Sequence, residues 1–229
     1  MRISIVISTL LSGGAERNAC VLANYFTKNN DVKLITFQKS KKSFYDISKK
    51  EEIKNLNLLK ESSFFFIKIL NFLKRIYIIR KNFKKEKPEV IISFLETTNI
   101  TVLISSLFLK DIKLKIISDR NNPNFTENKI LIFFLKKLFY QSANFLILQT
   151  NKIKENYKFI NNKKIKIIPN TISKIQNVKK KILINNSIKI LCVGRLENQK
   201  GYNILIRALK YLKKDKIKFK CDIYGTGSE

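Results

Sequence analysis

The sequence predicts an α/β protein: a doubly wound parallel sheet with helices on both faces, followed by the start of a second, smaller unit of the same kind. Short apolar runs alternate with stretches of helical apolar spacing along the 229-residue chain. This alternation is typical of β-α-β units with parallel strands. One Lys- and Asn-rich segment of weak periodicity, residues 169–187, interrupts the pattern. We therefore expect a first domain over residues 1–168, a linker over 169–187 and an incomplete second domain over 188–229.

The expected elements follow from the spacing of apolar residues. Strands are expected at short apolar runs rich in β-branched residues, over residues 3–8, 32–37, 90–94, 115–118, 145–148, 165–168, 188–193 and 219–224. Helices are expected where apolar residues share one helical face, over residues 15–28, 64–85, 97–109, 129–141, 152–159 and 202–212.

A pair of glycines, Gly13 and Gly14, opens the first helix directly after the first strand. Glycine lets the backbone approach a phosphate, and the N-terminus of a helix favours its negative charge. A plain strand-to-helix turn is the alternative interpretation. The spacing differs from the dinucleotide-binding fingerprint, so we expect no nicotinamide site.

Two cations, Arg195 and Lys200, lie in the turn between the strand at 188–193 and the next helix. Open α/β sheets bind ligands at the carboxyl ends of their strands. The planar fork of arginine and the point charge of lysine together suit a diphosphate. The alternative is that both are ordinary solvated loop cations in a Lys-rich chain.

These two motifs carry a family resemblance. The segments VGRL at 193–196 and QKGY at 199–202, together with GGAER at 13–17, resemble retaining glycosyltransferases of the GT-B architecture, family 4. Ile168-Pro169-Asn170 is similar to the crossover between the two Rossmann-like domains of that family. The resemblance implies hexosyl transfer, with retention, from a nucleotide-sugar donor to a cell-envelope glycan or a lipid-linked oligosaccharide.

The resemblance also implies roles for individual residues. Arg195 and Lys200 would stabilise the leaving diphosphate as catalytic residues, and the donor site would also include Gly13, Gly14, Gly225 and Gly227. The acceptor site would include Glu16, Arg17, Asp119 and Arg120. The last two belong to the sequence SDRNNP at 118–123, which resembles a box in members that extend bacterial surface glycans, although turn chemistry explains most of it equally well. No cofactor and no metal are expected, because the chain has no DxD-type pair.

The chain also departs from the family pattern. It ends at Glu229, just after Gly225-x-Gly227 and before the two-glutamate motif and the returning helix of the family, and it contains no His. We therefore expect a fragment or a decayed remnant that is inactive by itself. A non-catalytic module that binds an acceptor or a membrane is the alternative.

The formal charge of +29 has two interpretations. One is a nucleic-acid-binding surface. The other is compositional bias, because Lys, Asn and Ile are abundant in every segment. We favour the bias and expect no nucleic-acid partner, since no helix-turn-helix, zinc-finger or RNA-binding aromatic motif is present. The charge would still favour an anionic bilayer surface, by about 1 kcal/mol for each suitably placed cation.

Two aromatic-rich segments, residues 64–85 and 129–140, also contain several cations. They are interpreted either as interfacial helices that contact lipid or as helices that cover the sheet. We favour the second for residues 64–85, because their apolar positions exceed one clean face. The other segment has Phe133, Phe134 and Phe139 beside Lys136 and Lys137, and either helix would suit a lipid-linked acceptor.

Three isolated cysteines, Cys20, Cys192 and Cys221, lie in apolar segments and are expected to be buried free thiols. Their odd number and the lack of a Cys-x-x-Cys pattern favour a reducing compartment. No signal peptide and no uncharged run of transmembrane length is evident. We expect a cytoplasmic protein, with peripheral attachment to the inner face of the cytoplasmic membrane as an open alternative.

Overall fold

The computed structural model describes residues 1–39, 43–48, 52–59, 64–120, 129–171 and 188–228. The chain divides into two compact units, Met1–Ile172 and Ser173–Glu229, and each is described by itself. Most of the expected linker, residues 172–187, and residues 121–123 of the SDRNNP box lie outside the described residues.

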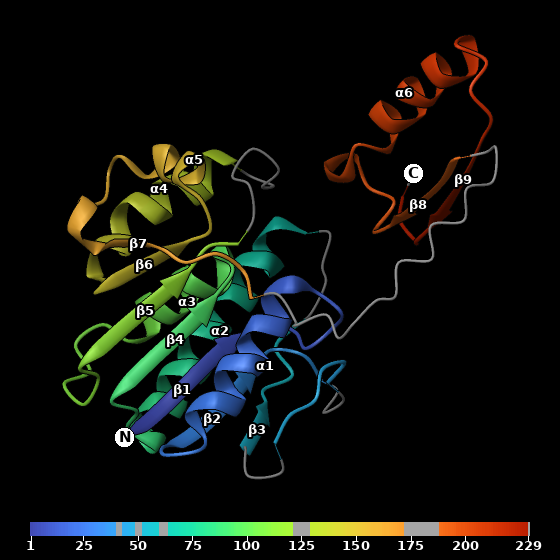
Figure 1. Ribbon diagram of the computed structural model, residues 1–229. Helices are drawn as coiled ribbons and strands as arrows, with labels where there is room; N and C mark the ends of the chain where they lie inside the picture. The colour runs from blue at the N-terminus through green and yellow to red at the C-terminus, as the bar shows by residue number, and fades with distance from the viewer. Residues whose placement is uncertain (40–42, 49–51, 60–63, 121–128, 172–187, 229) are drawn as a thin grey trace. The chain divides into compact units, whose positions relative to one another are not determined.

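The first unit is built on a seven-stranded parallel sheet (Figure 1). Its order is β3-β2-β1-β4-β5-β6-β7, so the chain winds outward from β1 to one edge, returns, and continues from β4 to the other edge. The prediction of a doubly wound parallel sheet is confirmed. The strands are β1 (Arg2–Ile7), β2 (Asp31–Thr36), β3 (Glu52–Asn55), β4 (Val90–Phe94), β5 (Leu114–Ser118), β6 (Phe145–Leu148) and β7 (Ile165–Ile167).

Helices cover both faces of this sheet. In Figure 1, α1 lies in front of the strands, and α2 and α3 lie behind them. Alternate residues of β1 explain this arrangement: Ile5 packs with α1 residues in one core cluster, whereas Val6 packs with α2 and α3 residues in another. The helices are α1 (Gly14–Phe26), α2 (Phe65–Glu86), α3 (Glu96–Ser105), α4 (Lys129–Phe139) and α5 (Asn151–Lys154). The last is shorter than expected and continues as a 3-10 turn, Glu155–Tyr157.

Strand β3 was not expected, because its sequence is short and polar. It pairs with β2 at the edge of the sheet, where Lys33 lies opposite Glu52. Lys33 and Lys54, on these two strands, both form ion pairs with Glu86 at the end of α2. Tertiary contacts therefore stabilise a strand that apolar patterning does not predict.

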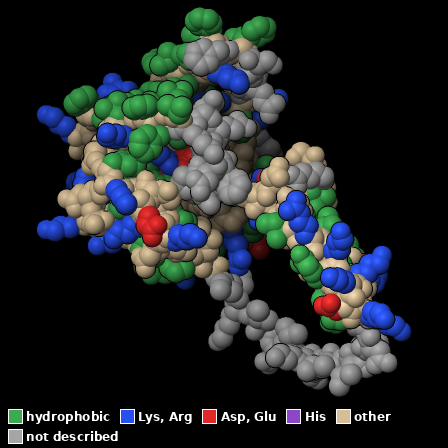
Figure 2. Space-filling view, turned by 90° about the horizontal axis from the view of Figure 1, so that it is seen from above, with side chains coloured by type: hydrophobic (Ala, Val, Ile, Leu, Met, Phe, Trp, Pro, Cys, Tyr) green, Lys and Arg blue, Asp and Glu red, His purple; other side chains and the backbone are tan. Residues whose placement is uncertain are grey.

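The two halves of helix α2 differ in how far their apolar side chains are buried. Its C-terminal half packs on the sheet, with Ile79 and Phe83 buried, as the favoured interpretation expected. Its N-terminal half carries an exposed apolar stripe of Phe66, Leu70, Leu73 and Tyr77. Helix α4 has a similar exposed row of Ile130, Leu131, Phe134 and Leu138. In Figure 2, hydrophobic side chains gather toward the upper left of the larger body, with Lys and Arg between them.

The second unit consists of β8 (Ile188–Val193), α6 (Tyr202–Lys214) and β9 (Phe219–Tyr224). The two strands pair in parallel, as expected for a β-α-β piece. None of the described residues of this unit is buried. Cys192 and Cys221 are accordingly half-buried rather than buried, whereas Cys20 in the first unit is buried as expected.

Replacing Glu86 by Gln tests the ion pairs that hold β3 and α2 together. Hydrogen bonds from Lys33 and Lys54 lower the pKa of the Glu86 carboxyl from 4.5 to about 2. Ionised Glu86 therefore stabilises the folded state fully above pH 4.5, and this contribution is lost as the pH falls toward 2. In urea unfolding we expect Glu86→Gln to be less stable than wild type at neutral pH and the difference to shrink across that interval. Glu155→Gln, at an exposed carboxylate, is the control; a pH-independent difference for Glu86→Gln contradicts the prediction.

Candidate functional site

The carboxyl edge of the seven-stranded sheet is the candidate site, because open α/β sheets bind ligands there, where the strand order reverses. This reversal lies between β1 and β4. Leu95, just after β4, has a left-handed φ of 74°, and its N–H donates to the carbonyl oxygen of Ser118 over 3.0 Å. Strained non-glycine residues of this kind are concentrated at functional sites.

Asp119 is the centre of a buried polar network just after β5. Its carboxylate accepts hydrogen bonds from Asn99 Nδ2 over 2.6 Å and from the Tyr140 hydroxyl over 2.9 Å. The Tyr157 hydroxyl donates to the other oxygen, and Lys136 Nζ lies 3.0 Å from it. The residue is 0% exposed. This corrects the expectation that Asp119 contacts an acceptor, since the carboxylate is fully enclosed and instead anchors the loop that carries Arg120.

Lys136 supplies the positive charge of this network. It is 4% exposed and forms ion pairs with Glu96 at the start of α3 and with Asp119. Its Nζ also lies 4.9 Å from the centre of the Tyr157 ring. Of the two cations noted in this helix, Lys136 is therefore buried in the network, and Lys137 is exposed. One sequence signal could have indicated its burial: Lys136 lies four residues before Tyr140 and therefore on the same, inward face of the helix.

Burial raises the pKa of the Tyr140 and Tyr157 phenols well above their usual range, and the Asp119 charge raises both further. Both hydroxyls therefore stay protonated and donate to the carboxylate. Asn99 completes the network by donating to the Ser118 carbonyl oxygen over 3.1 Å. Asn99, Tyr140 and Tyr157 were not predicted, because they lie far apart in the sequence and resemble ordinary helix residues.

Arg120 reaches the candidate site and is half-buried there. Its Nε donates to Ser118 Oγ over 2.9 Å, Nη1 donates to Asn170 Oδ1, and Cζ lies 5.5 Å from the centre of the Phe94 ring. Asn170 also accepts from Asn18 on α1. The structure thus joins the expected acceptor residue Arg120 to the start of the expected crossover, a contact that no sequence motif indicated.

The Gly13–Gly14 turn has a different occupant from the expected phosphate. The Glu16 carboxylate folds back over Gly13. It lies so close that a Cβ on Gly13 would be 2.0 Å from Glu16 Oε2. Thr9 Oγ1 donates to this carboxylate over 2.8 Å. Space is open beside Gly14, and Arg17 is half-buried on the same helix. A phosphate at the Gly13 amide would require Glu16 to move.

In the second unit, Arg195 and Lys200 lie in the turn after β8. Arg195 Nη1 pairs with Glu197 Oε1 over 2.9 Å, and its side chain is 64% exposed. The Lys200 side chain passes over Gly194, where an added Cβ would lie 3.8 Å from Lys200 Cε. The turn therefore presents two cations close to one glycine, at the carboxyl end of β8.

Gly225 and Gly227 are explained by close backbone approach. A Cβ on Gly225 would lie 1.8 Å from the Gly194 carbonyl oxygen, and one on Gly227 would lie 1.8 Å from that of Leu196. The segment after β9 thus lies directly against the segment after β8, and only glycine fits. This packing reason is independent of any donor.

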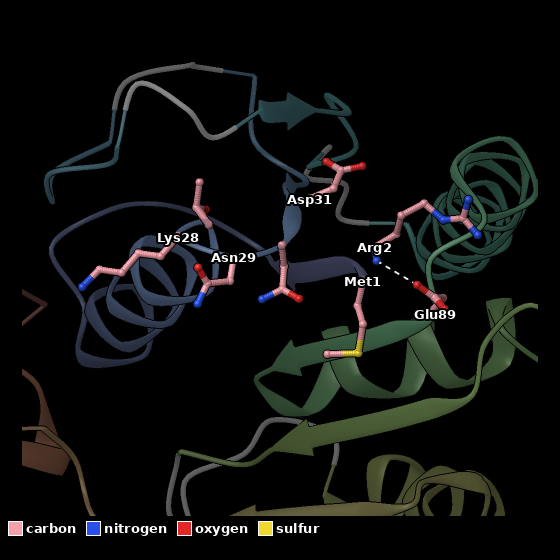
Figure 3. A pocket seen from close by; sticks show the side chains of 8 residues that line it. Met1, Arg2, Lys28, Asn29, Asp31 and Glu89 are labelled. Carbon is pink, nitrogen blue, oxygen red and sulfur yellow. Dashed lines mark hydrogen bonds between the residues drawn. The ribbon is translucent and has the colours of Figure 1, made fainter.

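A hollow of about 610 Å³ lies at the opposite, amino edge of the first sheet. Figure 3 shows Met1, Arg2, Lys28, Asn29, Asp31 and Glu89 around it, with the Arg2 N–H donating to Glu89 over 3.1 Å. Ligand sites of α/β sheets lie at the carboxyl edge, and none of the expected site residues lines this hollow. We therefore assign it no role.

The described part of the chain contains no group of three metal-ligating side chains. Among the described helices, none is long and apolar enough to cross a membrane.

Comparison with known proteins shows which family the chain resembles. The family model described as "Glycosyl transferases group 1" matches residues 174–229. An α-1,4-N-acetyl-D-galactosaminyltransferase of Campylobacter jejuni, named for the acceptor GalNAc-α-(1→4)-GalNAc-α-(1→3)-diNAcBac-PP-undecaprenol, is 30% identical over 229 residues. The match covers 99% of this chain and 62% of the relative. Residues 174–229 thus match the group 1 glycosyltransferases, and the chain is similar to one such enzyme over 99% of its length.

A second Campylobacter jejuni relative is a 4-α-N-acetylgalactosaminyltransferase named for a diphospho-undecaprenol acceptor. It is 32% identical to this chain, over 99% of the chain and 63% of the relative. An uncharacterized glycosyltransferase of Methanocaldococcus jannaschii is 32% identical over 68% of the chain and 43% of the relative. The chain thus spans less than two thirds of the length of these relatives.

Solved structures confirm the GT-B-type, Rossmann-like fold of the chain. The lipopolysaccharide outer core galactosyltransferase WaaB matches with a TM-score of 0.71 at 15% identity, over 100% of this chain and 62% of that one. Sucrose-phosphate synthase of Thermosynechococcus elongatus matches with a TM-score of 0.74 at 11% identity, over 100% and 63%. At these low sequence identities, the matches show a similar fold and nothing about activity.

Replacing Lys136 by Met tests the buried network. The substitution would leave Glu96 and Asp119 buried without their cation, so we expect a loss of about 3–5 kcal/mol in the free energy of unfolding, measured by urea denaturation. Lys137→Met, at the exposed neighbour, should change it by less than about 0.5 kcal/mol. Equal effects of the two substitutions would show that the network does not hold the site together.

Proposed function

We propose that this glycosyltransferase transfers a hexosyl group, with retention, from a nucleotide-sugar donor to a glycan carried on an isoprenyl diphosphate or on the cell envelope. One observation carries the proposal. Two relatives that match 99% of the chain are named for acceptors on diphospho-undecaprenol. The chain covers 62% and 63% of these relatives, so the activity belongs to a protein of their length.

The proposed chemistry is electrostatic. When the glycosidic bond of the donor breaks, negative charge develops on the leaving nucleoside diphosphate. Arg195 and Lys200 would stabilise this charge from the turn after β8, and the stabilisation would grow as the charge grows. The Arg195–Glu197 ion pair is exposed, so Arg195 can exchange this partner for a phosphate at small cost. In this proposal the two cations replace an obligatory metal ion.

We also propose that the first unit binds an anionic membrane surface through the exposed apolar faces of α2 and α4. Phe66 is 79% exposed and Phe134 is 62% exposed. The same two helices carry the exposed lysines Lys68, Lys74 and Lys137. Apolar side chains accompanied by cations are typical of helices that lie in the interface of anionic bilayers, where a lipid-linked acceptor resides.

The role of the two cations is tested in an enzyme of the length of its relatives. Arg195→Ala and Lys200→Ala should each lower kcat/KM for the nucleotide sugar by about 30- to 900-fold, equal to roughly 2–4 kcal/mol. Arg195→Lys should recover only part of the loss, because the bidentate fork is missing. Lys210→Ala and Lys213→Ala, on α6, are charge-matched controls. Unchanged kcat/KM in a folded Arg195→Ala protein would refute the assignment.

Membrane binding is tested by sedimentation of the 229-residue chain with vesicles. We expect binding to phosphatidylglycerol vesicles that weakens with salt and is small on phosphatidylcholine alone. Phe66→Ser combined with Phe134→Ser should lower the partition coefficient by about tenfold or more. Phe108→Ser, at a 93% exposed aromatic residue after α3, is the control. Equal binding of both variants would exclude α2 and α4 as the contact.

A further inference from the structure

Three hydrogen-bond donors from three different elements converge on one oxygen atom at the carboxyl edge of the first unit. Asn170 Oδ1 accepts from Asn18 Nδ2 over 3.2 Å, from Gln149 Nε2 over 3.1 Å and from Arg120 Nη1. An amide oxygen offers two lone pairs, so three donors exceed its capacity. The donor arrangement suits an oxygen with more negative charge and a wider spread of lone pairs, such as a phosphoryl oxygen.

The charge balance supports the same ligand class. Arg120 is the only charged member of the three donors, and no carboxylate in the described part of the chain forms an ion pair with it. The adjacent Asp119 is paired with Lys136 instead. Arg120 is fixed in place by Ser118 Oγ and by the Phe94 ring. A half-buried, oriented guanidinium whose partners among the described residues are neutral is well placed to bind an anion.

We propose that Asn18, Arg120 and Gln149 form a binding site for a phosphoryl oxygen of a diphosphate ligand, and that the Asn170 side chain occupies this site when the ligand is absent. Asn170 is exposed, so it can leave without disturbing the core. The ligand class rests on the proposed function, whereas the anion chemistry rests on the donors alone. Because Asn170 and Thr171 begin the connection out of the first unit, and Thr171 Oγ1 donates to Asn18 Oδ1 over 3.3 Å, ligand binding would release the start of that connection.

The test is calorimetric titration of the 229-residue chain with inorganic pyrophosphate at constant ionic strength. All variants carry Arg195→Ala and Lys200→Ala, so that the second unit contributes no diphosphate site. Asn170→Ala removes the competing oxygen and should tighten binding by about threefold or more. Asn170→Asp supplies a stronger occupant and should weaken binding. Arg120→Ala should weaken it by about tenfold or more.

Arg2→Ala is the matched control, because it lowers the net charge by one at the opposite edge of the same sheet. Its effect on pyrophosphate binding should be within about twofold. The proposal is overturned if Asn170→Ala binds no tighter than the parent, which is the result expected if Asn170 is merely a structural clasp. It is also overturned if Arg120→Ala and Arg2→Ala have equal effects. Thermal unfolding of each variant verifies folding, and the exposed position of Asn170 makes its variants decisive even if Arg120→Ala is unstable.

Two further probes identify the source of the diphosphate. Preferential binding of geranyl diphosphate over UDP, sensitive to Arg120→Ala, would assign the site to an isoprenyl diphosphate acceptor. The opposite preference would assign it to the donor. Either result supports the site. Arg195 and Lys200 are absent from this assay, so loss of the Arg120 site leaves the proposed transfer reaction standing, and failure of the transfer reaction leaves the Arg120 site standing.

Discussion

The carboxyl edge of the first unit depends on the ion pairs of Lys136 with Asp119 and Glu96. These three side chains come from α4, the loop after β5 and the start of α3, and all are nearly enclosed. Each charge would be costly to bury alone, so the three elements are held in one arrangement by the requirement that all three charges stay paired. The Tyr140 and Tyr157 hydroxyls satisfy the remaining lone pairs of Asp119, which makes the arrangement more specific still.

The position of Arg120 depends on this network. Lys136 and Asn99 fix the Asp119 carboxylate. Arg120, the next residue, therefore leaves the sheet at a defined point, and its guanidinium lies over the Phe94 ring. A surface arginine would lose rotamer entropy on binding a phosphate, but Arg120 is already oriented by Ser118 and Asn170. The buried ions thus fix the position of the half-buried Arg120 side chain, whose Nη1 donates to Asn170 Oδ1.

The second unit reaches its geometry by a different constraint. Gly225 and Gly227 allow the chain after β9 to lie against the chain after β8, at a distance that any Cβ would prevent. This contact fixes the turn that carries Arg195 and Lys200, while the two cations themselves remain exposed. The exposed cations of this turn contrast with Arg120 of the first unit, which is held in place by hydrogen bonds.

The sequence alone determined the parallel α/β fold, the position of most strands and helices, and the resemblance to group 1 glycosyltransferases, because apolar periodicity and glycine-containing turns are local properties. It did not predict β3, whose Glu52 and Lys54 form ion pairs with Lys33 on β2 and Glu86 on α2. It did not predict that Asp119 and Lys136 are buried, because a charged residue is rarely buried and its partners lie in other elements. Only the tertiary structure brought Asn18, Arg120, Gln149 and Asn170 together, since a parallel sheet gathers the ends of strands that are far apart along the chain.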